Sequence, residues 1–225
     1  MENGADVNAQ CGEYGNALQA AAFAGHETIV NLLLQKGTDV NAQGGWYGNA
    51  LQAATFKGDE TIVNLLLENG ADVHAQGGEY GNALQAAALR GDETIVNLLL
   101  EKGADVNAQG GEYGNAVQAA AFEGHQTIVN LLLEKGADVN AQGGRYGNAL
   151  QAAAFEGHET IVNLLLEKGA DVNAQGGEYC NALQAAASAG YENIVNLLLQ
   201  KGNAQAGNVL HPALSEGHIS IVTSL

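Results

Sequence analysis

Basic residues are scarce in this chain, and their scarcity bears on the partners it can take. Only 8 of the 225 residues are Lys or Arg, whereas 25 are Asp or Glu, and the formal net charge is −17 at pH 7. Such a charge repels phosphate backbones and anionic lipid headgroups, and no block of Lys or Arg offers a local exception. The composition therefore argues against binding to nucleic acid and to membrane surfaces.

Cysteine, proline and long apolar runs are also nearly absent. Two cysteines, Cys11 and Cys180, do not make a disulfide framework, and we interpret them as incidental small residues. The longest apolar stretches resemble Leu32-Leu33-Leu34, far below the ~20 residues of a membrane span. Residues 1–10 lack the charged and apolar segments of a signal peptide. A cytosolic location is the simplest interpretation.

The feature that dominates the sequence is a repeat of 33 residues. A tyrosine column recurs at this step, as do an asparagine two residues later and the block Ile-Val-Asn-Leu-Leu-Leu. The tyrosines are Tyr14, Tyr47, Tyr80, Tyr113, Tyr146 and Tyr179. Six copies match at most positions, so one structural unit is repeated along the chain.

The copy at residues 111–143 shows the expected elements. Asn115 is a good helix N-cap, and an alanine-rich helix over 116–122 is expected to follow it and to stop at Gly124. Apolar residues at i, i+3 and i+4 predict a second helix over 127–135. Residues 137–146 are polar and glycine-rich, which predicts a β-turn or hairpin to the next copy.

Neither helix is long enough to be stable alone, since isolated helices shorter than ~12–15 residues are marginal in water. Each must bury its apolar face against neighbouring copies. The small residues Ala119, Ala120 and Ala121 let first helices approach closely, and Leu132 and its equivalents fill the space between layers. The sequence thus predicts an all-α repeat solenoid of stacked helix–turn–helix units with protruding hairpin loops.

At this point the chain resembles the ankyrin repeat family. Residues 156–174 match that family's consensus almost residue for residue, while its Thr-Pro-Leu-His motif is replaced by Asn148-Ala149-Leu150-Gln151. Asn caps a helix as well as Thr does, and Gln carries a donor and an acceptor that span a gap similar to that spanned by His. The string Tyr-Gly-Asn-Ala-Leu-Gln-Ala-Ala also resembles arrays of filamentous-fungal NLR-like proteins, which implies a sensor region of a larger signalling protein.

The resemblance divides the chain into three parts. Residues 1–11 match the tail of a truncated repeat, 12–206 hold six ankyrin repeats, the last with a shortened loop, and 207–225 form a degenerate, truncated repeat. The first full copy carries no polar residues in place of the repeated apolar ones, although terminal repeats normally need such residues for solubility. We therefore expect its apolar side to be exposed, sticky or frayed, and capable of self-association.

Residue positions that differ between copies are not required for packing the stack. The resemblance implies that hairpin tips and first-helix ends line a concave groove that docks other proteins. The variable tip column holds Glu13, Trp46, Glu79, Glu112, Arg145 and Glu178. The first-helix ends supply Phe56, Lys57, Leu89, Arg90, Phe122, Glu123, Phe155 and Glu156, and Tyr47 and Tyr80 lie beside the tips. These sixteen residues are the candidate partner-binding site.

Some of these candidate residues can instead be explained by packing within the solenoid. The phenylalanines are as consistent with covering a neighbouring helix as with binding, and the tyrosines are more consistent with stacking against loop backbone. Trp46 is the one aromatic residue in a mostly acidic column and favours binding, since Trp, Tyr and Arg are the usual interface anchors. The column of His26, Asp59, Asp92, His125, His158 and Tyr191 is typical of helix starts.

The repeated sequence pattern gives no support for catalysis, a metal site or a cofactor site. The histidines lie whole repeats apart, too far to share one ion, and no nucleophile–base set converges. The sequence therefore predicts a non-catalytic protein-binding module. A structural spacer, or an oligomerisation module acting through the ends of the solenoid, is the alternative.

Overall fold

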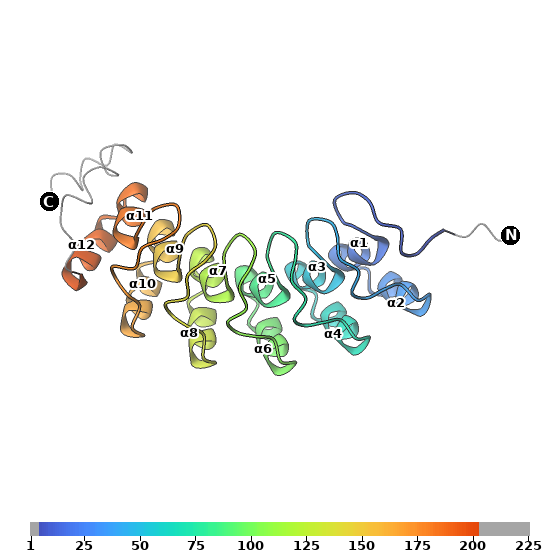
Figure 1. The fold of residues 1–225 in the computed structure, drawn as a ribbon. Helices are drawn as coiled ribbons and strands as arrows, with labels where there is room; N and C mark the ends of the chain where they lie inside the picture. The colour runs from blue at the N-terminus through green and yellow to red at the C-terminus, as the bar shows by residue number, and fades with distance from the viewer. Residues whose placement is uncertain (1–4, 203–225) are drawn as a thin grey trace. The chain divides into compact units, whose positions relative to one another are not determined.

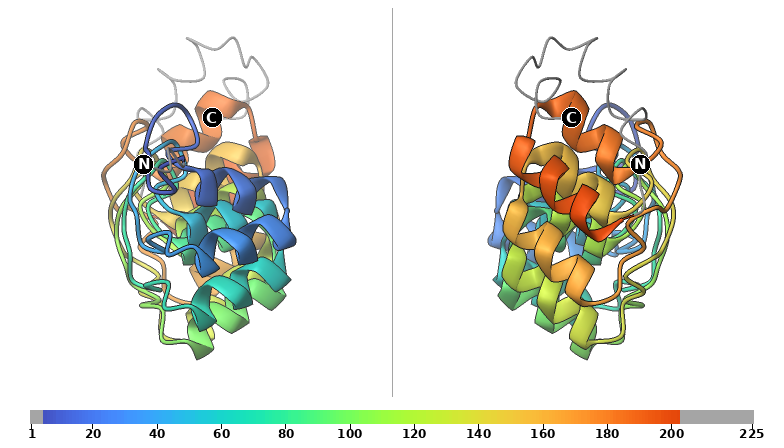
Figure 2. Two further views of the ribbon diagram at one scale, coloured as in Figure 1. Left: turned by 90° about the vertical axis from the view of Figure 1, so that its right-hand side faces the viewer. Right: turned by 90° about the vertical axis from the view of Figure 1, so that its left-hand side faces the viewer.

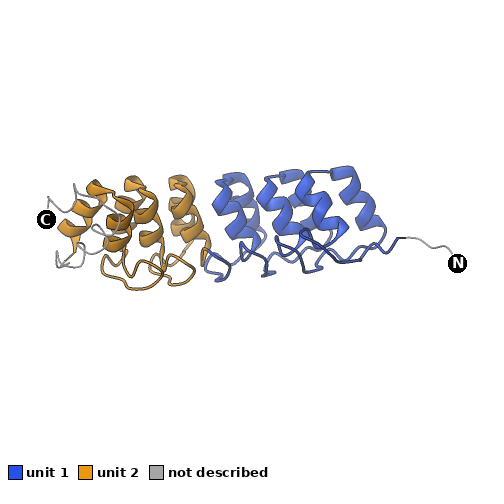
Figure 3. Ribbon diagram, turned by 90° about the horizontal axis from the view of Figure 1, so that it is seen from above, with its two compact units in different colours: residues 1–112 blue, residues 113–225 orange. Residues whose placement is uncertain are grey.

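The computed structural model describes residues 5–202, which fall into two compact units divided between Glu112 and Tyr113 (Figure 3). The expected shortened loop and the degenerate repeat at 207–225 lie outside the described residues. Helices in the first unit are α1 (Ala17–Ala24), α2 (Glu27–Gln35), α3 (Ala50–Lys57), α4 (Glu60–Glu68), α5 (Ala83–Arg90) and α6 (Glu93–Glu101). Those in the second are α7 (Ala116–Glu123), α8 (Gln126–Glu134), α9 (Ala149–Glu156), α10 (Glu159–Glu167), α11 (Ala182–Ala189) and α12 (Glu192–Lys201).

Each unit stacks helix pairs in two layers (Figure 1). In the first unit α1, α3 and α5 make one layer and α2, α4 and α6 the other; in the second, α7, α9 and α11 pack beside α8, α10 and α12. Within each unit the loops lie on one side of the helices (Figure 2). The predicted all-α repeat of helix pairs is confirmed.

The predicted helix boundaries are correct to within one residue. Asn115 caps α7 by accepting from the backbone N–H of Gln118 at 2.9 Å, and Gly124 ends the helix with φ of 84°. The second helix of that copy starts at Gln126, one residue before the predicted start at Thr127, and ends at Glu134 rather than Lys135. No described helix is both long and apolar enough to span a bilayer.

The core is built from the repeated apolar columns. Most alanines of the first helices are fully buried, which lets neighbouring helices of that layer approach closely. The second helices contribute the fully buried residues Leu66, Leu99, Leu132 and Leu165. Ile62 and Ile95 are covered by the preceding copy, but their counterpart Ile29 is 45% exposed and Leu32 beside it is 52% exposed. The expected exposed apolar side of the first copy is therefore present, although α1 and α2 are both intact helices.

The glutamine of the altered motif joins each copy to the next loop. Gln19 Nε2 donates to the carbonyls of Ala42 and Gly48 at 3.1 and 3.0 Å, and Gln118 does the same with Ala141 and Gly147. The Nε2 donor of the glutamine thus spans the predicted gap, whereas the Oε1 atom of Gln118 has no hydrogen-bond partner among residues 5–202. The loops close with isolated bridges such as Gly143 to Gly147 rather than with paired strands.

A second link between loops is made by asparagine side chains in both units, and His74 stands in place of one of these asparagines. Asn41 accepts from the N–H of Asp72 at 2.8 Å and donates to the carbonyl of Gly70 at 3.0 Å, and Asn140 makes the equivalent pair of bonds in the second unit. His74 occupies this position in the second copy, beside a pocket of about 110 Å³ that Leu84, Asp105 and Ala108 help to line. An imidazole cannot reproduce the paired donor and acceptor of an amide at this spacing.

Replacing His74 with Asn is therefore expected to stabilise the first unit. Two exposed hydrogen bonds at the low end of the usual range would raise the free energy of unfolding by about 1 kcal/mol. The measurement is urea unfolding followed by the fluorescence of Trp46, the single tryptophan, with an increased midpoint at unchanged slope as the expected result. Asn41→His is the reciprocal control and should lower the midpoint; a midpoint that His74→Asn leaves unchanged contradicts the explanation.

Candidate binding surface

The hairpin tips of the first unit are joined backbone to backbone. The N–H of Trp46 donates to the carbonyl of Glu13 at 2.7 Å, that of Glu79 to Trp46 at 3.0 Å, and that of Glu112 to Glu79 at 3.0 Å. In the second unit Glu178 donates to the carbonyl of Arg145 at 2.9 Å. The variable tip column is thus a continuous row within each unit, and its side chains project from a fixed backbone.

Glycine makes this close joining possible. Gly45 has φ of 65°, and a Cβ there would lie 2.5 Å from the backbone N of Gly15 and 2.6 Å from the carbonyl oxygen of Glu13. Gly78, Gly111, Gly144 and Gly177 occupy the same position in the later copies, with equally close backbone neighbours. A side chain at this position would push neighbouring tips apart.

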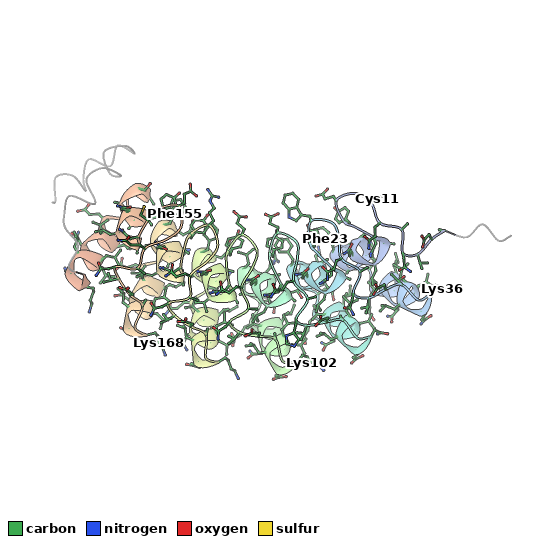
Figure 4. All side chains as sticks on the ribbon, viewed as in Figure 1. Cys11, Phe23, Lys36, Lys102, Phe155 and Lys168 are labelled. Carbon is green, nitrogen blue, oxygen red and sulfur yellow. The ribbon has the colours of Figure 1, made fainter. Side chains whose placement is uncertain are left out.

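Below the tips, aromatic rings form a strip along each unit. In the first unit the ring of Phe23 lies between Tyr14 and Tyr47, with centroid distances of 5.6 and 4.6 Å, and Phe56 lies between Tyr47 and Tyr80 at 5.6 and 4.4 Å. Figure 4 places Phe23 near the loops, whereas Lys102 of the same unit lies at the far end of α6. These separations fall in the range of favourable ring pairs.

The second unit repeats the strip with the order Tyr113, Phe122, Tyr146, Phe155 and Tyr179, at centroid distances of 4.5–5.7 Å. The interpretation that the tyrosines stack on loop backbone was incomplete. Their rings contact the phenylalanines because each loop folds back over the end of the preceding first helix. The phenylalanines therefore pack, while their partial exposure leaves part of each ring accessible.

The first unit gathers Trp46, Glu79 and Tyr80 around one tip. Trp46 is 52% exposed. Burial raises the pKa of Glu79, the nearby Glu112 carboxylate raises it further, and a hydrogen bond from the Trp46 side chain acts in the opposite direction. Burial likewise raises the pKa of Tyr80, with Glu79 adding to the effect. This part of the row therefore combines an exposed indole with crowded carboxylates.

Helix-end residues of the first unit border the strip. The guanidinium of Arg90 lies 5.7 Å from the Phe56 ring centroid, within cation–π range. Lys57 is exposed and its Cε lies beside Gly25, the glycine that ends α1. Leu89, at the place of the phenylalanines, is only 7% exposed, so it supports the surface from below.

In the second unit, two charged hairpin-tip residues form an ion pair. Arg145 Nε lies 2.7 Å from Glu178 Oε2, with both side chains about half exposed, and the guanidinium lies 5.6 Å from the Tyr146 ring centroid. Glu123 is exposed at the end of α7. At the end of α9 burial raises the pKa of Glu156, His158 lowers it, and Glu123 raises it.

The helix-start column also joins copies. Asp59 and Asp92 cap α4 and α6 by accepting from Ile62 and Ile95 N–H groups at 3.0 Å, as the helix-start interpretation predicts. His158 makes no cap but lies over Gly124, with Nε2 2.8 Å from the Phe122 carbonyl oxygen, and Tyr191 lies over Gly157. His158 and Tyr191 therefore pack against the preceding copy.

Among residues 5–202, no group of three or more His, Cys, Asp or Glu side chains is arranged to hold a metal ion. Cys11 and Cys180 are free and exposed. Cys180 adopts φ of 64° at a position that is glycine in the other copies. It is the one non-glycine residue with positive φ in the part of the chain described.

Stacked helix pairs whose hairpins are joined at their tips define a repeat protein with one continuous variable surface per unit. The model of the family described as ankyrin repeats (3 copies) matches residues 1–77, 50–143, 84–176 and 150–225. The chain therefore belongs to the ankyrin repeat family, whose members are generally protein–protein interaction modules and typically not enzymes. A comparison with curated proteins found no match.

The structure brings most of the predicted site residues of each unit onto one surface. Trp46, Tyr47, Phe56, Tyr80 and Arg90 are linked by ring, cation–π and hydrogen-bond interactions. Sequence reasoning missed the ring strip, including Tyr14, Phe23, Tyr113, Tyr146 and Tyr179, and the tip-to-tip backbone bonds. The equal 33-residue steps of the Tyr and Phe columns were the available signal.

Proposed function

We propose that this chain is a non-catalytic module that binds a protein partner on its tip face. The tip face is defined, in each unit, by the hairpin-tip row, the aromatic strip below it and the first-helix ends. One observation carries the proposal: side chains that differ from copy to copy project from a backbone row that is held fixed. A rigid row of variable side chains suits recognition, because little conformational entropy is lost on binding.

Trp46 is the central anchor of the proposed surface. It is exposed and aromatic, and such residues dominate binding energies when a partner covers them. Lys57 and Arg90 add charge at one border of the strip, while Glu13 and Glu79 add the opposite charge at the other. The two borders would orient a partner across the strip.

The triple variant Trp46→Ala, Lys57→Ala, Arg90→Ala tests this function. We expect it to weaken partner binding at least about tenfold, since loss of a single anchor can cost 2 kcal/mol or more. Binding is measured by capture from a cell extract and then by titration with the captured, purified protein.

The matched control is Lys36→Ala with Lys102→Ala. It removes two exposed cations that directly follow α2 and α6 and leaves the tip face intact. Its binding should equal that of the parent chain. Equal capture by all three chains would remove the tip face from consideration.

The context of the module is a further part of the proposal. The resemblance of the Tyr-Gly-Asn-Ala-Leu-Gln-Ala-Ala string to fungal arrays supports a sensor or scaffold region of a larger signalling protein. A nucleotide-binding domain encoded in the same open reading frame would agree with this context.

Self-association through the first copy is the second candidate function. The exposed Ile29 and Leu32 favour it, because their counterparts in later copies lie against a preceding copy. End-to-end association would make the free energy of unfolding rise with chain concentration, and substitution of Ile29 is the change that reports on it.

A further inference from the structure

We propose that the pocket beside His74 binds a primary carboxamide group, either of a free small amide or of an Asn or Gln side chain of another protein. The residues that line this pocket do not belong to the tip face, so the site goes beyond the proposed function. Its chemistry follows from a comparison of equivalent junctions between successive copies.

The junction one copy earlier shows how these loops hold an amide. The side chain of Asn41 accepts from the N–H of Asp72 at 2.8 Å and donates to the carbonyl of Gly70 at 3.0 Å. One amide thus pairs with a donor and an acceptor that lie two residues apart on the next loop. Asn140 is held by the equivalent pair of bonds in the second unit.

The same two backbone groups are left open at the junction that contains His74. Within residues 5–202 the N–H of Asp105 and the carbonyl of Gly103 have no hydrogen-bond partner, and the His74 side chain forms no hydrogen bond. Every other residue that lines the pocket has an identical counterpart 33 residues earlier, from Val40 to Ala75. The exchange of Asn for His therefore leaves this donor and acceptor open.

The pocket lies beside these groups and has room for an amide. Its volume is about 110 Å³, and Asp105 and Ala104 help to line it. A single water molecule needs only about 10–15 Å³, so a group the size of acetamide fits. Val73 and Leu84 also line the pocket, and they provide apolar contact for the carbon atom attached to the amide.

A primary carboxamide matches the site better than related small groups do. Its oxygen accepts and its NH₂ group donates, as the N–H of Asp105 and the carbonyl of Gly103 require. A tertiary amide keeps the acceptor but has no donor. A carboxylate of the same shape also has no donor, and both the Asp105 side chain and the net charge of −17 repel it.

Acetamide, N,N-dimethylacetamide and acetate are the probes that test the site. In the chain carrying isotope-labelled aspartate, acetamide should shift the NMR signal of the Asp105 N–H with a Kd on the order of 10–100 mM, as expected for two ordinary hydrogen bonds. N,N-dimethylacetamide should bind about tenfold more weakly, and acetate should cause no saturable shift. The N–H of Asp72, already bonded to Asn41, is the internal reference and should not respond.

Two substitutions should remove the site or create it elsewhere. His74→Asn supplies the amide from the chain itself and should abolish the response of Asp105. Asn41→His reproduces the same junction one copy earlier, so Asp72 should now respond as Asp105 does in the parent chain. Circular dichroism verifies that both variants are folded.

Four results would each overturn the inference. The first is a parent Asp105 signal that responds no more than that of Asp72, and the second is an equal response to acetamide and N,N-dimethylacetamide. The third is an unchanged response of Asp105 in His74→Asn, and the fourth is an Asp72 signal that stays unaffected in folded Asn41→His.

The peptide Gly-Gln-Gly distinguishes the two sources of the amide. An affinity within about twofold of that of acetamide would support a side chain of another protein as the ligand. Binding of acetamide without binding of the peptide would support a free small amide. The proposed function is tested separately, because neither His74→Asn nor Asn41→His changes a residue of the tip face.

Discussion

Gly78→Ala is expected to lower the free energy of unfolding of the first unit by roughly 3–5 kcal/mol. Gly78 has φ of 65°, where an L side chain costs about 1–2 kcal/mol by itself. A Cβ at this position would lie 2.5 Å from the carbonyl carbon of Tyr47 and 2.6 Å from the nitrogen of Gly48. Backbone atoms cannot yield as a flexible side chain does, so the tips must separate.

Gly70→Ala is the control for backbone strain alone. Gly70 has φ of 86°, but a Cβ there would meet no atom within 4 Å. We expect this variant to cost only about 1–2 kcal/mol, the left-handed penalty without the clash. Both free energies come from urea unfolding followed by Trp46 fluorescence. If the two variants cost the same, close joining of the tips contributes nothing to the stack.

The comparison bears on function because Gly78 precedes a tip residue. Separation at Gly78 would break the bond between the Glu79 N–H and the Trp46 carbonyl, and so move the two side chains apart. Gly78→Ala should therefore also weaken binding to a partner that spans the row. Stability and recognition depend on the same backbone row.

Much of the fold could be predicted from the sequence because each local signal recurs six times. Asn115 and its equivalents cap the first helices, and the glycines that end them have positive φ, as the pattern predicts. The bridging by the Nε2 donor of Gln118 was also expected. Such local chemistry depends on a few neighbouring residues, which the sequence displays directly.

The candidate surface was less predictable because its contacts join residues far apart in the chain. Arg145 and Glu178 are 33 residues apart, and their pairing depends on how two loops stack. Tyr47 contacts a phenylalanine nine residues later in its own copy, Phe56, and one 24 residues earlier, Phe23, and Tyr146 does the same with Phe155 and Phe122. Loop geometry decides these contacts, and it follows from positive-φ glycines whose spatial neighbours the sequence does not name.

Burial also differed between copies with the same sequence. The segment Glu-Thr-Ile-Val-Asn-Leu-Leu-Leu is identical in the first three copies, yet Ile29 is 45% exposed and Ile95 is 0% exposed. Position in the stack, and not the local sequence, sets this difference. The absence of polar substitutions in the first copy was the signal that allowed its exposure to be predicted.

The variants Ile95→Ala and Ile29→Ala measure how this difference in burial affects the free energy of unfolding. Ile95→Ala should lower the free energy of unfolding by about 2–5 kcal/mol, because it removes buried methyl groups and leaves a cavity. Ile29→Ala removes the same atoms from the same helix position, but about half of that side chain is already exposed. We expect it to cost less than about 1 kcal/mol. Helix propensity changes equally in both variants and cancels from the comparison.

The measurement is urea unfolding at several chain concentrations. If the chain is monomeric, the difference between the two variants will be constant at all concentrations. If first copies pack against another chain, the parent will become more stable as concentration rises, and the cost of Ile29→Ala will grow towards that of Ile95→Ala. Equal costs at the lowest concentration would instead contradict the account in which each helix pair is stabilised by the copy before it.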